Sequence, residues 1–217
     1  MTPTITVANP DWLAELAPPD LVIADPADRV RLAIRLALEN VERGTGGPFG
    51  AAVFEAATGR LVAAGVNRVV PLGNSALHAE VVALMFAEAR VGSYSLSVSE
   101  HELVASCEPC AMCLGATLWS GVRRLAFAAA RDEALAAGFD EGPVFPESYA
   151  YLARAGVEVV RGLCREEGAK PFELIDGDLA LHGRRIDQTP PGVVDACRNI
   201  AVERGRAINW LCGEWDR

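Results

Sequence analysis

The spacing of apolar side chains predicts that helices and strands alternate along most of the chain. Asp25 followed by Pro26 has the form of a helix N-cap and first helical residue, and apolar side chains then recur at helical spacing to about Arg43. Short apolar runs at 51–54 and 61–66 flank a turn. They predict a β-hairpin that follows the first helix.

The same alternation continues beyond the hairpin. A buried helix is predicted from His78 to about Arg90, because apolar residues fill most of its first two turns. Further predicted elements follow in chain order: a strand at 103–106, a helix near Cys110, a strand at 122–129, a helix near 148–155 and a strand at 157–160. This order predicts an α/β fold, a three-layer α/β/α sandwich with a mixed sheet of about five strands.

The predicted elements divide the chain into three parts. Residues 1–24 are rich in proline and predict an irregular N-terminal arm. Residues 25–176 hold the predicted sandwich and form the main domain. Residues 177–217 are interpreted as a C-terminal extension, because apolar residues after a Pro-Pro pair lie at helical intervals. We expect this helix to dock on the domain or on a second subunit, and the pattern assigns no function to residues 190–217.

One histidine and two cysteines have the residue types and the spacing of a zinc site. A catalytic zinc takes three nitrogen or sulfur ligands from the protein and leaves its fourth tetrahedral position open. Cys110 and Cys113 are three residues apart, so on a helix they project from one face. Pro109 suits the first position of that helix, which would place Cys110 at the positive end of the helix dipole. With His78 as the third ligand, they predict one mononuclear zinc site.

Glu80 lies two residues after the predicted ligand His78, near the start of the same predicted helix. This position is close to the metal but is not needed for a fourth ligand. The carboxylate therefore suits a general acid and base that moves protons between water and substrate. The order His-x-Glu and then Pro-Cys-x-x-Cys is the signature of zinc-dependent nucleobase deaminases. A zinc-dependent deaminase is the hypothesis that this pattern favours.

Each part of this pattern has another interpretation. The cysteine pair alone fits a structural zinc knuckle, a redox pair or two small buried residues. Cys107 is the nearest spare thiol, and as a fourth ligand it would close the metal site and exclude catalysis. A zinc-folded module that binds a partner through the tail helix is the non-enzymatic alternative. The sequence assigns no role to Cys107, Cys164, Cys197 or Cys212.

Composition narrows the range of partners and compartments. The 217 residues are 51% hydrophobic and 23% charged, which is typical of a globular protein. Asp and Glu number 29 against 20 Lys and Arg, and the net charge of −9 disfavours nucleic acid as a partner. Six cysteines, some of them in the metal motif, favour a reducing compartment over a disulfide framework. Without a signal-peptide pattern or an apolar run of membrane-spanning length, we expect a cytoplasmic protein with no membrane partner.

A set of longer segments carries a resemblance to one family. The segments are Gly47-Pro48-Phe49-Gly50-Ala51, Gly65-Val66-Asn67-Arg68-Val69, His78-Ala79-Glu80-Val81, Ser106-Cys107-Glu108-Pro109-Cys110-Ala111-Met112-Cys113-Leu114-Gly115-Ala116 and Gly138-Phe139-Asp140-Glu141-Gly142-Pro143. On these segments, over about residues 26–176, the chain resembles the cytidine deaminase-like superfamily and, within it, the guanine deaminase branch of small bacterial enzymes. The zinc motifs are specific to the superfamily, and the segments around Asn67 and Glu141 point to the guanine branch.

The resemblance implies hydrolytic deamination of a free amino-heterocycle, foremost guanine to xanthine and ammonia, with one Zn2+ per chain. Glu80 would shuttle protons, and Asn67 would hydrogen-bond the base. Asp140 or Glu141 would assist proton transfer or hold the exocyclic amine. These residue types suit such roles, since an amide reads both donor and acceptor edges and a carboxylate pairs with an amidine-like N–H face. The structural alternatives are that Asn67 makes a turn after a strand and that Glu141 is a solvated loop charge.

The resemblance also implies how the pocket is lined and closed. Phe49 and the backbone near Ala79 would line it, and Trp119 would close it, unless Trp119 is a core residue. The chain departs from the family pattern at its C-terminus, where dimeric relatives often have Tyr or Asn near a Gly. Here His182 stands in the corresponding stretch, as a substitute polar contact to the substrate or as an exposed loop residue. This departure affects the prediction of which base is the substrate more than the prediction of hydrolytic deamination.

The remaining expectations concern substrate and assembly. Nearby substrates are an ammeline-like triazine, a pterin or cytosine. A tRNA adenosine deaminase is a further alternative, which the acidic composition and the lack of a basic tail disfavour. Because relatives of this type are generally dimers, we expect a homodimer.

Overall fold

The computed structural model describes residues 4–172, 174–175, 178–181 and 184–185. The predicted tail helix and His182 lie outside these residues. The elements are, in chain order, α1 (Leu13–Leu16), α2 (Pro26–Glu42), β1 (Gly50–Glu55), β2 (Leu61–Val66), α3 (Val69–Leu72), α4 (Ala79–Val91), η1 (Leu96–Val98), β3 (His101–Cys107), α5 (Ala111–Ser120), β4 (Arg124–Ala129), α6 (Arg131–Ala136), α7 (Pro146–Arg154), β5 (Glu158–Val160), α8 (Arg165–Ala169), η2 (Lys170–Phe172), β6 (Leu174–Ile175), β7 (Asp178–Leu181) and β8 (Arg184–Arg185).

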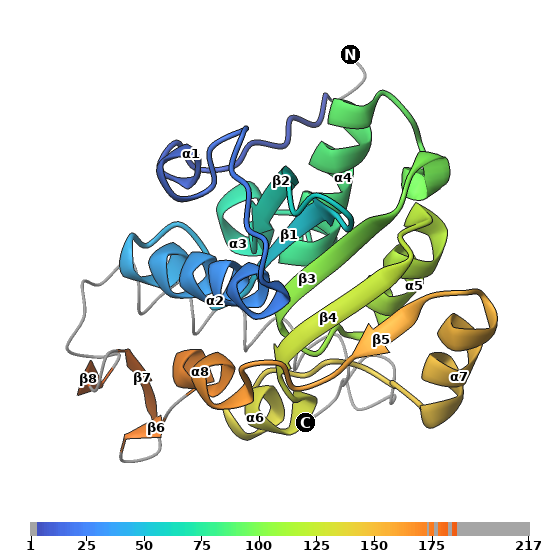
Figure 1. Cartoon of the computed structure of the whole chain (residues 1–217). Coiled ribbons are helices and arrows are strands. Elements are labelled where there is room, and N and C mark those ends of the chain that lie inside the picture. The colour runs from blue at the N-terminus through green and yellow to red at the C-terminus, as the bar shows by residue number, and fades with distance from the viewer. Residues whose placement is uncertain (1–3, 173, 176–177, 182–183, 186–217) are drawn as a thin grey trace.

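A five-stranded sheet forms the centre of the fold, with the strand order β2-β1-β3-β4-β5 (Figure 1). β1 pairs antiparallel with β2 and with β3, so that Ala51 lies opposite Gly65 on one side and Ala105 on the other. β3 pairs parallel with β4, and β4 pairs parallel with β5. The predicted hairpin is therefore present, and the sheet is mixed, as predicted.

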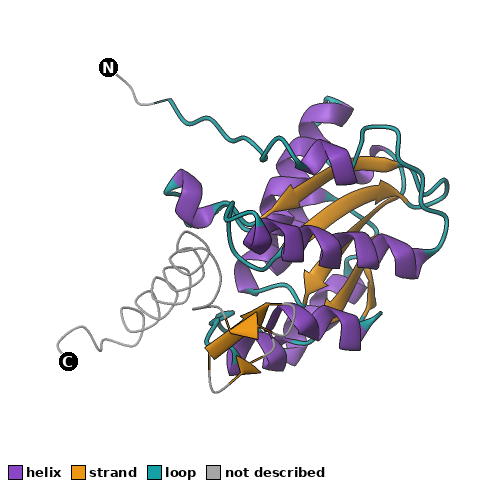
Figure 2. Cartoon of the chain, turned by 90° about the vertical axis from the view of Figure 1, so that its left-hand side faces the viewer, coloured by secondary structure: helices purple, strands orange, loops and turns teal. Residues whose placement is uncertain are grey.

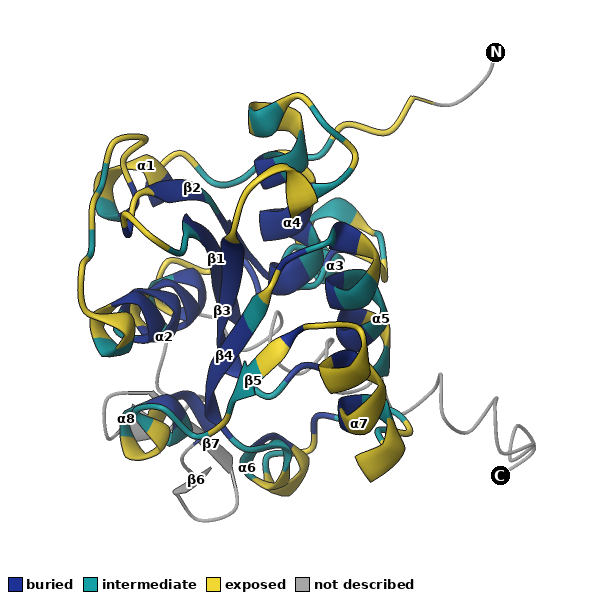
Figure 3. Ribbon diagram, turned by 45° about the vertical axis from the view of Figure 1, so that its right-hand side comes forward, coloured by how far each residue is buried: buried dark blue, intermediate teal, exposed yellow. Residues whose placement is uncertain are grey.

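Side chains of the central strands alternate between two hydrophobic cores. In β1, Ala51 and Val53 join the core on the side of α4 and α5, whereas Ala52 and Phe54 join the core on the side of α2. Successive side chains of a strand point to opposite faces, so a strand covered on both faces is buried throughout, as β3 is. Figures 2 and 3 show helices on both sides of the buried sheet. The predicted three-layer α/β/α sandwich is confirmed.

The helix α2 begins and ends close to its predicted limits. Asp25 is the N-cap, and its side chain accepts the backbone N–H of Ala27 at 2.8 Å. Pro26 occupies the first helical position, where its missing N–H costs no hydrogen bond. The apolar stripe of α2 packs on β1 and β3, across the sheet from α4.

The helix α6 is an element that the sequence does not predict. Its N-cap, Ala130, has no side-chain acceptor of its own. The acceptor is Glu108, whose Oε2 accepts the backbone N–H of Arg131 at 3.0 Å across a sequence separation of 23 residues. Sequence reasoning places helix starts from a local cap residue, and here the cap comes from a distant segment. The short helices α3 and α8 are also absent from the prediction.

The N-terminal and C-terminal segments contain elements that the sequence does not predict. The arm contains α1, and Trp12 and Leu13 are buried against the α2 side of the sheet. Near the end of the described chain, β6, β7 and β8 form a small antiparallel sheet of their own. Within the described residues, each helix is too short or too polar to span a bilayer. The division into arm, domain and extension stays a prediction.

Candidate active site

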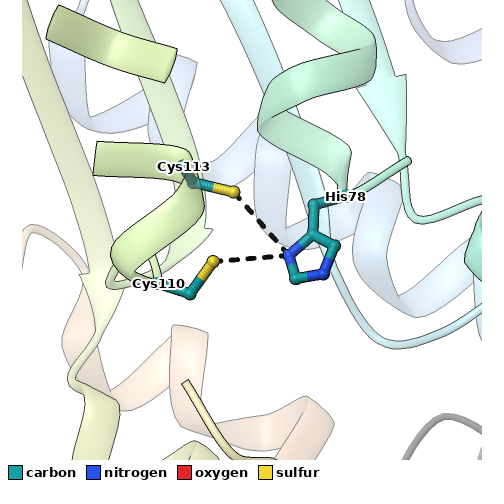
Figure 4. A group of neighbouring side chains, drawn as sticks. All are labelled: His78, Cys110 and Cys113. Atoms are coloured by element: carbon teal, nitrogen blue, oxygen red, sulfur yellow. Dashed lines mark hydrogen bonds between the residues drawn. The ribbon is translucent and has the colours of Figure 1, made fainter. Parts of the chain in front are cut away.

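Two helix N-termini meet at the candidate metal site. His78 is the N-cap of α4 and Cys110 is the N-cap of α5, and Cys113 lies in the first turn of α5. Figure 4 shows both sulfur atoms directed at the ring of His78. The prediction that Pro109 is the first helical residue is wrong, because Cys110 has extended backbone (ψ 172°) and the helix begins at Ala111. Cys110 is nevertheless at the positive end of the helix dipole.

The three side chains have the spacing that a tetrahedral zinc ion requires. The Sγ atoms of Cys110 and Cys113 lie 3.5 and 3.7 Å from Nδ1 of His78. Zinc binds nitrogen at about 2.0–2.1 Å and sulfur at about 2.3 Å, which at tetrahedral angles places these atoms about 3.6 Å apart. All ligand atoms of the cluster lie within 4.8 Å of one another. The donor types and the distances therefore fit zinc.

Cys107 does not join this cluster. Its thiol donates to the carbonyl oxygen of Ala130 at 3.9 Å. Within the part of the chain that the structure describes, the cluster consists of His78, Cys110 and Cys113. Three protein ligands are typical of a catalytic zinc, whereas a structural zinc takes four.

The carboxyl group of Glu80 lies beside the cluster, without being a member of it. Glu80 is the second residue of α4 and is 7% exposed, and its side chain hydrogen-bonds Cys113. Burial raises the pKa of Glu80, and the negative charge of Cys110 raises it further. A buried carboxyl group beside a metal site can both accept and donate a proton, which is the chemistry of a general acid and base.

The two thiols differ in their tendency to ionise. The hydrogen bond with Cys113, together with the hydrogen bond and charge of His78, lowers the pKa of Cys110 to about 4 against the effect of burial. The hydrogen bond with Cys110 and burial raise the pKa of Cys113 well above its ordinary value. A thiolate at Cys110, at the helix N-terminus, would attract a cation.

Glu141 reaches the site from the loop between α6 and α7. It is 4% exposed, and its carbonyl oxygen accepts the backbone N–H of Ala111, the first residue of α5, at 3.1 Å. Arg131 donates to two carbonyl oxygens of the same loop, those of Gly142 at 3.4 Å and Val144 at 3.3 Å. Asp140 has a different position, since its side chain closes a turn by accepting the N–H of Gly142 at 2.7 Å. The loop thus holds Glu141 next to the turn that carries Cys110.

Asn67 directly follows β2 and is completely buried. Its Oδ1 accepts the N–H of Val69 at 3.3 Å, and its Nδ2 has no hydrogen-bond partner among the described residues. A buried amide donor is normally satisfied by a protein group, a water molecule or a ligand, and this nitrogen is available to one of the last two. The turn predicted as the structural alternative for Asn67 is also present, and it uses the oxygen rather than the nitrogen.

The other predicted pocket residues differ in their placement. Phe49 is 6% exposed and packs against Phe139 with ring centroids 5.2 Å apart, and Ala79 is completely buried at the start of α4. Trp119 is 83% exposed and lies six residues beyond Cys113 on α5, about 9 Å along the helix axis. The structure therefore does not bring Trp119 next to the cluster within one chain. His182 lies outside the described residues.

Glu108 is a residue of this region to which the sequence assigns no role. Its carboxylate accepts the backbone N–H of Arg131 at 3.0 Å and the hydroxyl of Tyr149. The guanidinium of Arg161 lies over the Tyr149 ring at 3.8 Å from its centroid. Glu108 thereby ties the turn before Cys110 to α6 and α7. An acidic residue directly before Pro-Cys is the only local signal, and it does not identify the distant partners.

Comparisons with known proteins agree with this geometry. Residues 26–129 match the cytidine and deoxycytidylate deaminase zinc-binding region. The guanine deaminase of Bacillus subtilis is 39% identical over 118 residues, which are 54% of this chain and 73% of that protein. The solved guanine deaminase of Nitrosomonas europaea is 41% identical, with a TM-score of 0.74 over 78% of this chain and 94% of that one. The structure of NE0047 in complex with 2,6-diaminopurine is 42% identical, with a TM-score of 0.73 over 76% of this chain and 89% of that one.

The matched region contains the histidine, the glutamate and both cysteines that the structure brings together. The fold, the ligand set and the relatives all lead to one assignment. The chain belongs to the cytidine and deoxycytidylate deaminase family, zinc hydrolases that act on C–N bonds, and within it to the guanine deaminase branch.

Proposed function

We propose that this protein deaminates guanine, converting guanine and water to xanthine and ammonia. The observation that carries the proposal is the buried carboxyl group of Glu80 beside a cluster of three zinc ligands. The guanine deaminases of Bacillus subtilis and Nitrosomonas europaea support the choice of base. NE0047 also binds 2,6-diaminopurine, and its variants bind 8-azaguanine, both of which share the bicyclic size and the 2-amino group of guanine.

Zinc held by His78, Cys110 and Cys113 would supply an activated water molecule for attack on the ring carbon that bears the amino group. Glu80 would accept a proton from the attacking water and deliver it to the ring nitrogen or to the leaving amine. Water thus replaces the amino group, ammonia leaves, and nothing is oxidised or reduced. The positive end of the α5 dipole favours the negative charge that develops at this point.

Asn67 and Glu141 would orient the base, and Phe49 with Ala79 would line its pocket. The free Nδ2 of Asn67 can donate to a carbonyl oxygen or a ring nitrogen. The buried carboxylate of Glu141 can accept the paired N–H groups of an amidine-like edge and assist proton transfer. Phe49, packed on Phe139, offers an apolar wall to a planar ring. Asp140 would contribute by shaping the turn beside Glu141.

We further propose one zinc per chain, a homodimer and a location in the cytoplasm. None of the described cysteines, Cys107, Cys110, Cys113 and Cys164, forms a disulfide, which supports a reducing compartment. The dimer is supported by apolar side chains exposed on two adjacent helices: Met112 (39%) and Trp119 (83%) on α5 and Met85 (42%) on α4. Trp119 would then act at the interface between subunits. Trp119→Glu tests this, and we expect light scattering to report a monomer.

Ammonia release from a panel of bases tests the proposed function. The panel contains guanine, ammeline, cytosine, adenine and pterin, and we expect guanine to be the preferred substrate. Glu80→Gln keeps the size of the side chain and removes its acid-base function, so we expect kcat to fall by about 10³-fold or more with zinc still bound. Glu88→Gln on the same helix is the matched control and should keep wild-type activity. An inert guanine beside an active second base would refute the substrate, and full activity of Glu80→Gln would refute the mechanism.

A further inference from the structure

The position of Asn67 depends on contacts to its backbone rather than to its side-chain nitrogen. Its N–H donates to the carbonyl oxygen of Phe49 at 3.1 Å. Its carbonyl oxygen accepts a hydrogen bond from Nδ2 of Asn40 at 3.0 Å. Asn40 lies in the last turn of α2, on the other face of the sheet from the zinc-binding helices. A residue remote from the metal therefore holds the peptide group of Asn67.

Every polar atom of the Asn40 side chain has a partner. Asn40 is completely buried, and its Nδ2 also donates to the carbonyl oxygen of Gly47 at 2.9 Å. Its Oδ1 accepts the hydroxyl of Thr45 at 2.8 Å, and that hydroxyl in turn accepts the indole N–H of Trp12 at 3.1 Å. A fully satisfied buried network holds its members in one geometry. The network fixes the direction of both Nδ2 hydrogens.

The chain is packed tightly where these groups meet. A Cβ atom at Gly46 would lie 1.9 Å from the carbonyl oxygen of Asn67 and 2.6 Å from Nδ2 of Asn40. Only glycine lets the backbone approach this closely. Arg68, which follows Asn67, donates its backbone N–H to the carbonyl oxygen of Leu77 at 2.9 Å. Leu77 directly precedes the metal ligand His78. The same short segment thus connects Asn40, the predicted base contact and the metal site.

We propose that Asn40 is a positioning residue for recognition of the base, acting through Asn67. This inference rests on the proposed function, in which Asn67 contacts the substrate. Asn40 sets the orientation of the Asn67 peptide and thereby the direction in which its amide enters the pocket. Trp12 from the N-terminal arm and Thr45 from the loop after α2 support this arrangement.

A double-mutant cycle between Asn40 and Asn67 tests the proposal. Asn40→Asp keeps the shape of the side chain and the oxygen that Thr45 binds, and it removes both N–H donors. We expect KM for guanine to rise about tenfold and kcat to change less than about threefold, because a lost hydrogen bond in a buried site has an effect of this size. In an Asn67→Ala background, the same substitution should change kcat/KM less than about twofold, since the positioned amide is already absent.

Controls separate positioning from stability and from metal binding. Glu39→Gln alters the neighbouring residue of α2, whose partner is the exposed Arg43, and should keep the wild-type KM. Glu102→Gln lowers stability at the far end of β3 and should also keep the wild-type KM. Zinc content should equal that of the wild type in every variant. If Asn40 had a purely structural role, Asn40→Asp would lower the melting temperature but keep the wild-type KM. The double-mutant cycle would then show no coupling between Asn40 and Asn67.

Two results would overturn the inference. One is a wild-type KM in Asn40→Asp, and the other is the same loss of kcat/KM in the wild-type and Asn67→Ala backgrounds. If Asn40→Asp does not fold, Thr45→Val replaces it, and an unchanged KM in Thr45→Val also overturns the inference. If wild-type protein leaves guanine untouched and converts another base, the proposed substrate fails, and the cycle is measured with that base.

Discussion

Glu102→Gln removes the negative charge from the centre of a buried ion cluster. The side chain of Glu102 is completely buried, and its two oxygens pair with Arg29 and, at 3.5 Å, with Arg124. The side chain of Arg29 is only 5% exposed. After the substitution, Arg29 is a buried cation without its counter-charge, and this is the source of the expected instability.

The expected loss of stability follows from the remaining contacts. Breaking a buried ion pair costs about 3–5 kcal/mol. The lower end applies here, because Arg29 keeps hydrogen bonds to the carbonyl oxygens of Ile23 (2.7 Å), Ala24 (3.1 Å) and Ala56 (3.4 Å), and glutamine keeps one acceptor. A loss of about 3 kcal/mol lowers the melting temperature of a chain of this length by about 6–12 °C.

Thermal unfolding followed by circular dichroism measures this loss, with zinc in excess for every variant so that metal binding does not vary. Glu158→Gln is the matched control. It removes the exposed partner of Arg124, a contact of 3.6 Å with Glu158 66% exposed, and should shift the melting temperature by less than about 3 °C. The kcat/KM of Glu102→Gln should equal that of the wild type, because Cys107, next to the metal segment, lies at the other end of β3. A shift of less than about 2 °C would refute the reasoning.

Further predictions concern the metal, the loop and pH. Cys110→Ser should lower zinc affinity at least about tenfold, measured by metal analysis after dialysis, and equal zinc content would contradict the ligand assignment. Glu141→Gln should lower kcat about 10²-fold, whereas Asp140→Asn, which keeps its turn-closing oxygen, should lower it less than about threefold. The hydrogen bond from Arg60 lowers the pKa of Glu55, so ionised Glu55 stabilises the folded state. This stabilisation is complete above the ordinary glutamate pKa and is lost as pH falls through the lowered pKa. In a plot of melting temperature against pH, Glu55→Gln should therefore reduce the decrease at acidic pH. An unchanged decrease would contradict this prediction.

The elements predicted correctly from the sequence have local signals. α2 has its cap and its proline within two residues, and its apolar stripe repeats at helical spacing. The hairpin is marked by two apolar runs and a turn, and β1 and β2 form as a pair. The ligand types and the His-x-Glu and Pro-Cys-x-x-Cys spacings predict the cluster of His78, Cys110 and Cys113 that the structure brings together. Each of these motifs spans only a few residues, although His78 lies 32 residues from Cys110 and 35 residues from Cys113.

Other features depend on which distant segments meet when the sheet assembles. Glu108 caps α6 from 23 residues away, and Asn40 reaches Asn67 across 27 residues. The thiol of Cys107 points toward the carbonyl oxygen of Ala130 and therefore does not close the metal site. The Cys-x-x-Cys spacing does not predict this direction. Hydrophobic periodicity specifies which face of an element is buried, but it does not specify which polar group that face will meet. The sequence by itself therefore determined the elements and the chemistry of the cluster, and only the tertiary structure decided the hydrogen bonds that hold the surrounding residues in place.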